Sequence, residues 1–318
     1  MEQTKSFLQS FNYHSYPARE CSNHSLYYDR MYSPEWLHMS VWLEDLHANA
    51  SECWRQWNEL GLKDAGVALQ LTETNSCFDM AGPDMVNYAN SFFYVASLGQ
   101  TAAAGLRMHS RWNLYGQHFG FVQPAVTRAK ARQVEGQLAP GSGAPFPVAV
   151  DYWVSVLFKM TAGSRVLAAN VTMDGYREAT TPVLAYAYCA GGGRAPAAGY
   201  TKGAVTLMML NTMKENVTVN VSGAVLASGV GTEQRFLDGD RLEWLLTPSS
   251  TNASGGVPLP IDQARFALLN GGAELHLESE GSLPSMNPRV AASGSALVLP
   301  PRAIGFVVLQ GAAASQCL

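Results

Sequence analysis

A carboxylate at the end of one apolar segment carries the clearest chemical signal in this sequence of 318 residues. The segment Val67–Leu71 is apolar apart from Gln70. It is too short for a complete helix, so it predicts a strand buried in a parallel sheet. Glu73 follows within the polar stretch Thr72–Ser76. Barrel enzymes place catalytic side chains at the carboxyl ends of such strands. Glu73 is therefore a candidate catalytic residue, and the plain alternative is a carboxylate that only faces water.

The elements around this strand alternate between strands and helices. Ser33 and Pro34 predict a helix start, and Gly61 and Gly99 are expected to end helices. The pattern gives three βα units before residue 162, whereas a complete (β/α)8 barrel usually takes ~250 residues. It predicts a smaller α/β domain or the last part of a barrel. Strands are expected at 7–16, 67–72 and 106–114, and helices from 34, at 50–60, at 85–98 and at 148–160.

The pattern changes at residue 163. Short apolar or β-branched segments follow one another, separated by Gly, Pro and Asn, which predicts an all-β sandwich. We therefore expect a domain boundary near residue 162. The expected strands are 165–171, 182–189, 203–210, 217–221, 243–246, 266–269, 296–299 and 304–309.

Composition excludes several classes of protein. Hydrophobic residues make up 47% and charged residues 14%, which supports a large core. A net charge of -4 argues against a nucleic-acid binder. No apolar run approaches the ~20 residues of a membrane span, and the N-terminus shows no signal-peptide core. No Cys or His cluster has zinc spacing, so we expect no metal site and no cofactor.

Two features indicate the secretory pathway. Asn-x-Ser/Thr sequons, each weak evidence alone, occur at Asn23, Asn49, Asn170, Asn216, Asn220 and Asn252. The odd number of cysteines leaves at least one unpaired within the chain. These cysteines are Cys21, Cys53, Cys77, Cys189 and Cys317.

Four short segments in the same order and with plausible spacing resemble one family. The residues from about Phe11 to Cys317 are similar to the C-terminal half of the heparanase-like enzymes, glycoside hydrolase family 79. The first match is the strand end Glu73-Thr-Asn-Ser76, which follows the family pattern Glu-Thr-Ser/Asn-Ser. The others are Ser110–Gly120, the helix that begins Asp151-Tyr-Trp153, and Pro300–Phe306.

The resemblance implies both a fold and a reaction. Residues 1–162 would be the last three βα units of a (β/α)8 TIM barrel, and residues 163–318 a C-terminal β-sandwich. The reaction would be retaining hydrolysis of a β-glucuronide in an acidic polysaccharide or proteoglycan glycan.

The resemblance also assigns roles. Glu73 would be the nucleophile, with His14 orienting it through a hydrogen bond and Arg111 giving electrostatic support or binding a uronate carboxylate. The alternatives are a core histidine for His14 and a structural ion pair with Glu73 for Arg111. The expected substrate-binding residues are Tyr16, Asn75, Phe78, Gly116 and Phe119.

Two departures from the family pattern stand out. Phe78-Asp-Met80 replaces Tyr-Gly-Gly, and Phe119 replaces a tyrosine, so the substrate is open. The family's general acid lies in an Asn-Glu pair on an earlier strand, and the pair Asn58–Glu59 falls on a predicted helix. We therefore expect this chain alone to be inactive or weak. The alternative is a non-catalytic fragment or subunit that binds carbohydrate or pairs with a chain supplying the other strands.

The family further implies a disulfide between Cys189 and Cys317, which requires an oxidising compartment. Cys77 is expected to be a packed thiol. A secreted or lysosome-like location follows from the resemblance.

Overall fold

A three-stranded parallel sheet forms the N-terminal part of the structure, which is a computed structural model. Its order is β1-β2-β3, with β1 at Ser10–Ser15, β2 at Ala68–Thr74 and β3 at Met108–Arg111. Neighbouring parallel strands in chain order are typical of successive βα units. Within the described residues these strands do not close into a barrel. The structure describes residues 8–17, 29–38, 48–76, 87–114, 120–122, 148–191, 199–225, 232–235, 239–249, 264, 266–277 and 282–318.

Helix α3 (Pro34–Leu37) begins at the residue that the sequence predicts, and α5 (Ala48–Glu59) lies within two residues of its predicted bounds. The Trp36 N–H donates to the Ser33 side chain over 3.2 Å, which confirms Ser33 as the cap of α3. The sequence predicts a longer helix, but α3 ends at Leu37 because His38 is extended, with a ψ of 150°. Residues 39–47 lie outside the described residues. After α5, Gly61 adopts a φ of 63°, the left-handed conformation that ends many helices.

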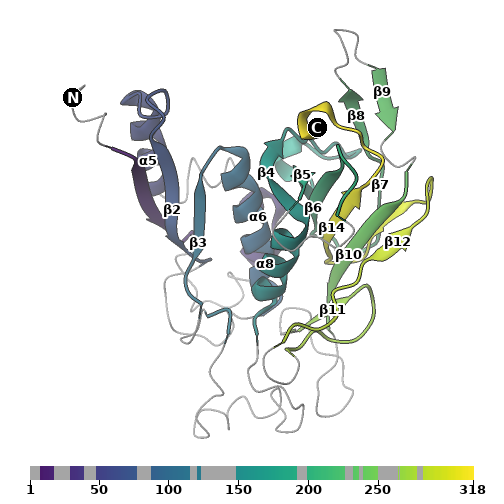
Figure 1. The fold of residues 1–318 in the computed structure, drawn as a ribbon. Helices are drawn as coiled ribbons and strands as arrows, with labels where there is room; N and C mark the ends of the chain where they lie inside the picture. Colours follow the sequence, from purple (N-terminus) through teal and green to yellow (C-terminus); the bar gives the residue numbers. More distant parts are fainter. Residues whose placement is uncertain are drawn as a thin grey trace, which may run out of the picture.

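Helix α6 (Asn90–Ala103) lies at the centre of the molecule. Together with α8 (Val150–Thr161) it separates the parallel sheet from a larger antiparallel sheet (Figure 1). Every residue from Asn90 to Gln100 is buried, as expected for a helix covered on all sides. Gly99 does not end this helix, contrary to the sequence prediction. A Cβ at Gly99 would overlap the ring of Tyr186, so glycine is needed here for close packing.

The second half of the chain forms a seven-stranded antiparallel sheet. The strand order is β11-β10-β14-β6-β5-β4, and β12 also pairs with β10. The sheet contains β4 (Ala162–Leu167), β5 (Val183–Ala190), β6 (Val205–Asn211), β10 (Arg241–Pro248), β11 (Ala267–Leu269), β12 (Arg289–Ala291) and β14 (Ile304–Leu309).

Both faces of this sheet are covered at its centre. One face packs against α6 and α8 in a single core that includes Trp153, Trp244 and Phe306. The other face packs against a small sheet of β7 (Val217–Val219) and β13 (Leu297–Leu299). The division at residue 162 and the sandwich layout stay predictions, since one core includes residues from both sides of 162.

The sequence did not predict three strands: β12 and the hairpin of β8 (Ser222–Val225) and β9 (Thr232–Arg235). Strand β9 reads Thr-Glu-Gln-Arg and has no apolar residue. Strand β12 has only three residues, and its Val290 is 66% exposed. Strands this short carry too little of the alternation on which sequence prediction depends.

Candidate active site

A bulge in β2 sets the direction of Glu73. The register pairs Tyr13 with Leu71 and His14 with Glu73, so Thr72 is an extra residue in β2. Leu69 and Leu71 pack with Trp57 of α5. Regular alternation would turn Glu73 to that same apolar face. The extra residue instead places Glu73 on the opposite face, beside His14.

Glu73 contacts two side chains, that of His14 in β1 and that of Tyr16 just after β1. The Tyr16 hydroxyl donates a hydrogen bond to Glu73 Oε1. His14 Nδ1 lies 3.6 Å from Glu73 Oε2, within ion-pair range but long for a hydrogen bond. The His14 side chain is 57% exposed and that of Glu73 is 20% exposed. Glu73 is thus held on one oxygen while its surroundings remain open to solvent.

Tyr16 is a permanent donor in this arrangement. Burial raises the pKa of Tyr16 well above its ordinary value, and the hydrogen bond to Glu73 and the charge of that carboxylate act in the same direction. The phenol therefore stays protonated at neutral pH and fixes the Glu73 carboxylate. The sequence assigned Tyr16 to substrate binding, which stays a prediction, and in the structure the hydroxyl contacts the nucleophile candidate.

Arg111 pairs with a different carboxylate from the one expected. Its Nε lies 2.7 Å from Asp151 Oδ2, and both side chains are 1% exposed. Asp151, in the first turn of α8, also accepts hydrogen bonds from Asn90 Nδ2 (2.9 Å) and Ser91 Oγ (2.7 Å). The Arg111 guanidinium carbon also lies 4.5 Å from the ring centroid of Phe121. Electrostatic support of Glu73 by Arg111 stays a prediction.

Asn75 connects the ends of β2 and β3. Its side chain is fully buried. Its Oδ1 accepts from the Ser76 N–H over 2.7 Å, and its Nδ2 donates to the Trp112 carbonyl over 2.9 Å. The Trp112 N–H donates to Thr74 O over 2.8 Å. The Asn75 amide therefore holds two strand ends together, and its predicted binding of substrate stays a prediction.

Trp112 is a candidate that the sequence interpretation missed. It lies at the end of β3, one strand from Glu73, and is 39% exposed although it is a large apolar residue. Both polar groups of its backbone are bonded at the end of β2, the N–H to the Thr74 carbonyl and the carbonyl to the Asn75 side chain. Its peptide bond with Asn113 is cis. An exposed indole at the strand end next to that of Glu73 is suited to stacking on a sugar ring. The signal in the sequence was an aromatic residue at a strand end.

The remaining predicted positions divide into two groups. Phe78, Gly116 and Phe119, like Cys21 and Cys77, lie outside the described residues. Among the described ones, Glu59 of the Asn58–Glu59 pair lies on α5 and forms an exposed ion pair with Arg55. This location agrees with the prediction that Asn58–Glu59 does not replace the family's general acid.

The disulfide between Cys189 and Cys317 is present, with a Cα–Cα distance of 5.2 Å and a sequence separation of 128 residues. Cys53 is a free thiol. The described residues include no cluster of three or more His, Cys, Asp or Glu side chains that could hold a metal. None of the described helices has the length and apolar character needed to cross a membrane.

Characterised relatives share about a quarter of their aligned residues with this chain. Heparanase from Bos taurus is 26% identical over 249 residues, which cover 78% of this chain and 37% of the relative. Inactive heparanase-2 from Homo sapiens is 24% identical over 240 residues, which cover 73% and 33%. Baicalin-β-D-glucuronidase from Scutellaria baicalensis is 26% identical over 224 residues, which cover 70% and 32%.

This chain is a relative of the heparanases. The four sequence segments predicted that relationship, and the comparisons confirm it. The chain spans about a third of the length of the heparanases and glucuronidase it matches. No family model matches the chain.

Solved structures support the fold of this heparanase relative. A 4-O-α-L-rhamnosyl-β-D-glucuronidase from Fusarium oxysporum superposes with a TM-score of 0.55 at 11% identity, covering 97% of this chain and 55% of the other. An α-L-arabinofuranosidase from Thermotoga maritima gives a TM-score of 0.55 at 12% identity, covering 95% and 52%. Both are glycoside hydrolases with TIM-barrel-like folds.

Proposed function

We propose that this chain is the nucleophile-bearing part of a retaining glycosidase of the endo-β-glucuronidase type. Its substrate would be a glucuronic-acid-containing polysaccharide or proteoglycan glycan. The observation that carries the proposal is the placement of Glu73, bulged out of the apolar face of β2 and bonded to Tyr16. The similarity to heparanases and to a β-D-glucuronidase supports the choice of sugar.

In the proposed mechanism a Glu73 oxygen attacks the anomeric carbon and forms a glycosyl ester, while the glycosidic C–O bond breaks. The Tyr16 hydroxyl holds the other carboxylate oxygen, so one oxygen remains oriented for attack. A second carboxylic acid protonates the leaving oxygen and then, as a carboxylate, activates the water that releases the sugar.

We propose that this second carboxyl group comes from outside the strands described here. Two observations support that view. Asp151 is buried in its pair with Arg111, and Glu59 lies on an exposed helix face with Arg55. On this account the chain alone turns over natural glycans weakly or not at all. A separate chain that supplies the remaining strands stays a prediction from the sequence.

The proposed architecture is the last three βα units of a (β/α)8 barrel in residues 1–162 and a β-sandwich in residues 163–318. The order β1-β2-β3 and the barrel-like fold of the solved relatives support the first assignment. The disulfide between Cys189 and Cys317 supports a secreted or lysosome-like location.

A non-catalytic carbohydrate-binding role is the second candidate. One observation favours it, namely that a relative at 24% identity is described as an inactive heparanase. The two roles separate in one assay, the hydrolysis of a chromogenic β-glucuronide by the chain and by its Glu73→Gln variant. The glycosidase proposal predicts that the variant loses the activity. Equal rates for the two proteins would remove Glu73 from the mechanism.

A further inference from the structure

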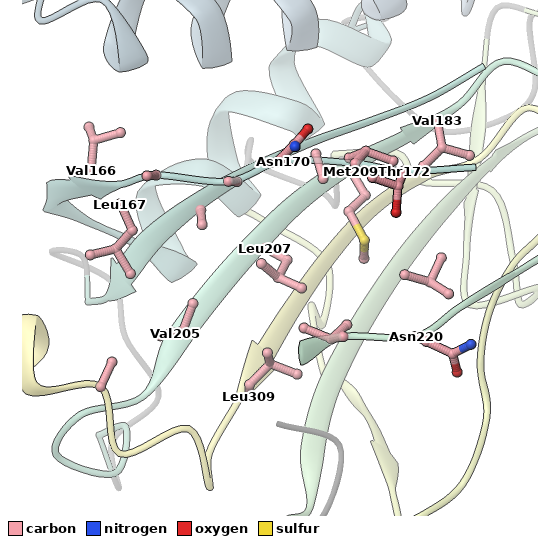
Figure 2. Close-up of a pocket in the computed structure, with 18 of the residues that line it drawn as sticks. Val166, Leu167, Asn170, Thr172, Val183, Val205, Leu207, Met209, Asn220 and Leu309 are labelled. Carbon is pink, nitrogen blue, oxygen red and sulfur yellow. The ribbon is translucent and has the colours of Figure 1, made fainter. Parts of the chain in front are cut away.

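A groove runs along the face of the antiparallel sheet that turns away from α6 and α8. Its volume is about 850 Å³. Strands β4, β5, β6 and β14 form the floor, and the segments around β7 and after β4 form the walls (Figure 2). Leu207, Met209 and Leu309 are buried floor residues. The groove lies on the opposite side of the sheet from the core that contains the two helices.

The lining of the groove carries no charged side chain. The described lining residues are apolar or uncharged polar ones. At the edge of the floor Leu167 is only partly buried, as are the wall residues Val171, Val217 and Val221. A group that covers these partly buried side chains would remove apolar surface from water, which is favourable. An acidic glycan would find no cation here, so the groove does not extend the proposed substrate site.

Two of the sequons lie on the walls of this groove. Asn170, in Asn-Val-Thr172, belongs to the segment after β4, and Asn220, in Asn-Val-Ser222, follows β7. Both asparagines are exposed, and Figure 2 labels both among the lining residues. An exposed asparagine in this triplet is the acceptor for N-linked glycans. Such glycans are added in an oxidising compartment, and the disulfide between Cys189 and Cys317 is compatible with folding there.

We propose that Asn170 and Asn220 carry N-linked glycans and that these glycans cover the apolar groove between them. The donor is an oligosaccharide linked to a polyprenyl diphosphate. In the transfer, the asparagine amide nitrogen bonds to the anomeric carbon of the donor's N-acetylglucosamine and loses one proton. The bond from that carbon to the diphosphate oxygen breaks, and the diphosphate leaves with the electron pair. The glycans are held beside the groove covalently, so no affinity for a free ligand is required.

The first test maps occupancy on the full chain secreted from eukaryotic cells. Peptide-N-glycosidase in heavy-oxygen water converts each glycosylated asparagine to a mass-labelled aspartate. The proposal predicts the label at Asn170 and Asn220, its loss in Thr172→Ala and Ser222→Ala, and its retention in Thr172→Ser and Ser222→Thr. An unlabelled Asn170 or Asn220 in the secreted, folded wild type would overturn the proposal.

The second test asks whether the glycans cover the groove. Asn216, in Asn-Val-Thr218, is also exposed but does not line the groove, so Asn216→Gln is the matched control. The double variant Asn170→Gln/Asn220→Gln should bind the apolar dye bis-ANS with a severalfold higher fluorescence than the wild type. The control should not differ from the wild type. Equal fluorescence in all three proteins would refute the proposal that these glycans cover the groove. Recovery of a tightly bound lipid from the glycosylated wild type would refute it as well. Neither test depends on glycosidase activity.

Discussion

The Arg111 guanidinium is bound by Asp151, in an ion pair 2.7 Å long between side chains that are 1% exposed. The pair joins the end of β3 to the first turn of α8, where the helix dipole also favours a negative charge. Asp151→Asn removes the negative charge that faces the buried Arg111 cation in this pair. We expect Asp151→Asn to lower the free energy of unfolding by ~3–5 kcal/mol, as measured by urea denaturation.

Two controls separate this effect from a general sensitivity to charge removal. Glu52→Gln removes a carboxylate from an exposed pair with Arg55 on α5, and should leave the denaturation midpoint unchanged. The double variant Arg111→Met/Asp151→Leu should be less destabilised than Asp151→Asn, because no buried charge remains. If the double variant were less stable than Asp151→Asn, the loss of stability in Asp151→Asn could not be attributed to a buried charge.

Tyr16→Phe removes the hydroxyl that donates to Glu73. A hydrogen bond to a charged group contributes roughly 1.5–3 kcal/mol, so we expect kcat on a chromogenic glucuronide with a good leaving group to fall about tenfold to a hundredfold. Tyr13→Phe is the matched control. Tyr13 lies on β1, three residues before Tyr16, and packs on the face opposite to Glu73, with Trp57 and Leu71. A kcat that falls equally in both variants would show that the loss comes from packing.

Gly99 should not tolerate alanine while Tyr186 is present. The ring of Tyr186 occupies the space that a Cβ at this position needs. We expect Gly99→Ala to cost ~1–3 kcal/mol in the free energy of unfolding. In a Tyr186→Ala background the same change should be neutral or stabilising by up to ~1 kcal/mol, because alanine is the better helix former. Additive costs in this double-mutant cycle would argue against the ring contact.

His109 makes stability depend on pH in the acid range. Burial lowers the pKa of His109 from 6.5 to about 4, and the charge of Arg111 acts in the same direction. Between these two values the unfolded chain binds a proton that the folded protein does not. The free energy of unfolding should therefore fall by roughly 3 kcal/mol as the pH drops from 6.5 to 4. His109→Gln should flatten this part of a denaturation series across pH, and an unchanged slope would exclude the assignment.

The sequence predicted the parts of the site that have a local signal. Glu73 stood out because polarity changes abruptly after Leu71, and the disulfide followed from the family resemblance. Other features depend on residues far apart in the chain. The bulge at Thr72 exists because Leu71 pairs with Tyr13 and Glu73 pairs with His14. The residue type of Thr72 does not by itself predict a bulge. Gly99 resembles a helix end in the sequence, and only its contact with Tyr186 of β5 explains why a glycine lies inside α6.

The most direct test of Glu73 is covalent trapping on this chain. A 2-deoxy-2-fluoro-β-glucuronide with a dinitrophenolate leaving group needs no general acid, because that leaving group departs as a stable anion. The nucleophile can therefore be tested without the second carboxyl group. After incubation and proteolysis, mass spectrometry should find the fluorosugar esterified to Glu73, and no label in Glu73→Gln. A label on another residue, or none on folded wild type, would contradict the assignment of Glu73 as the nucleophile.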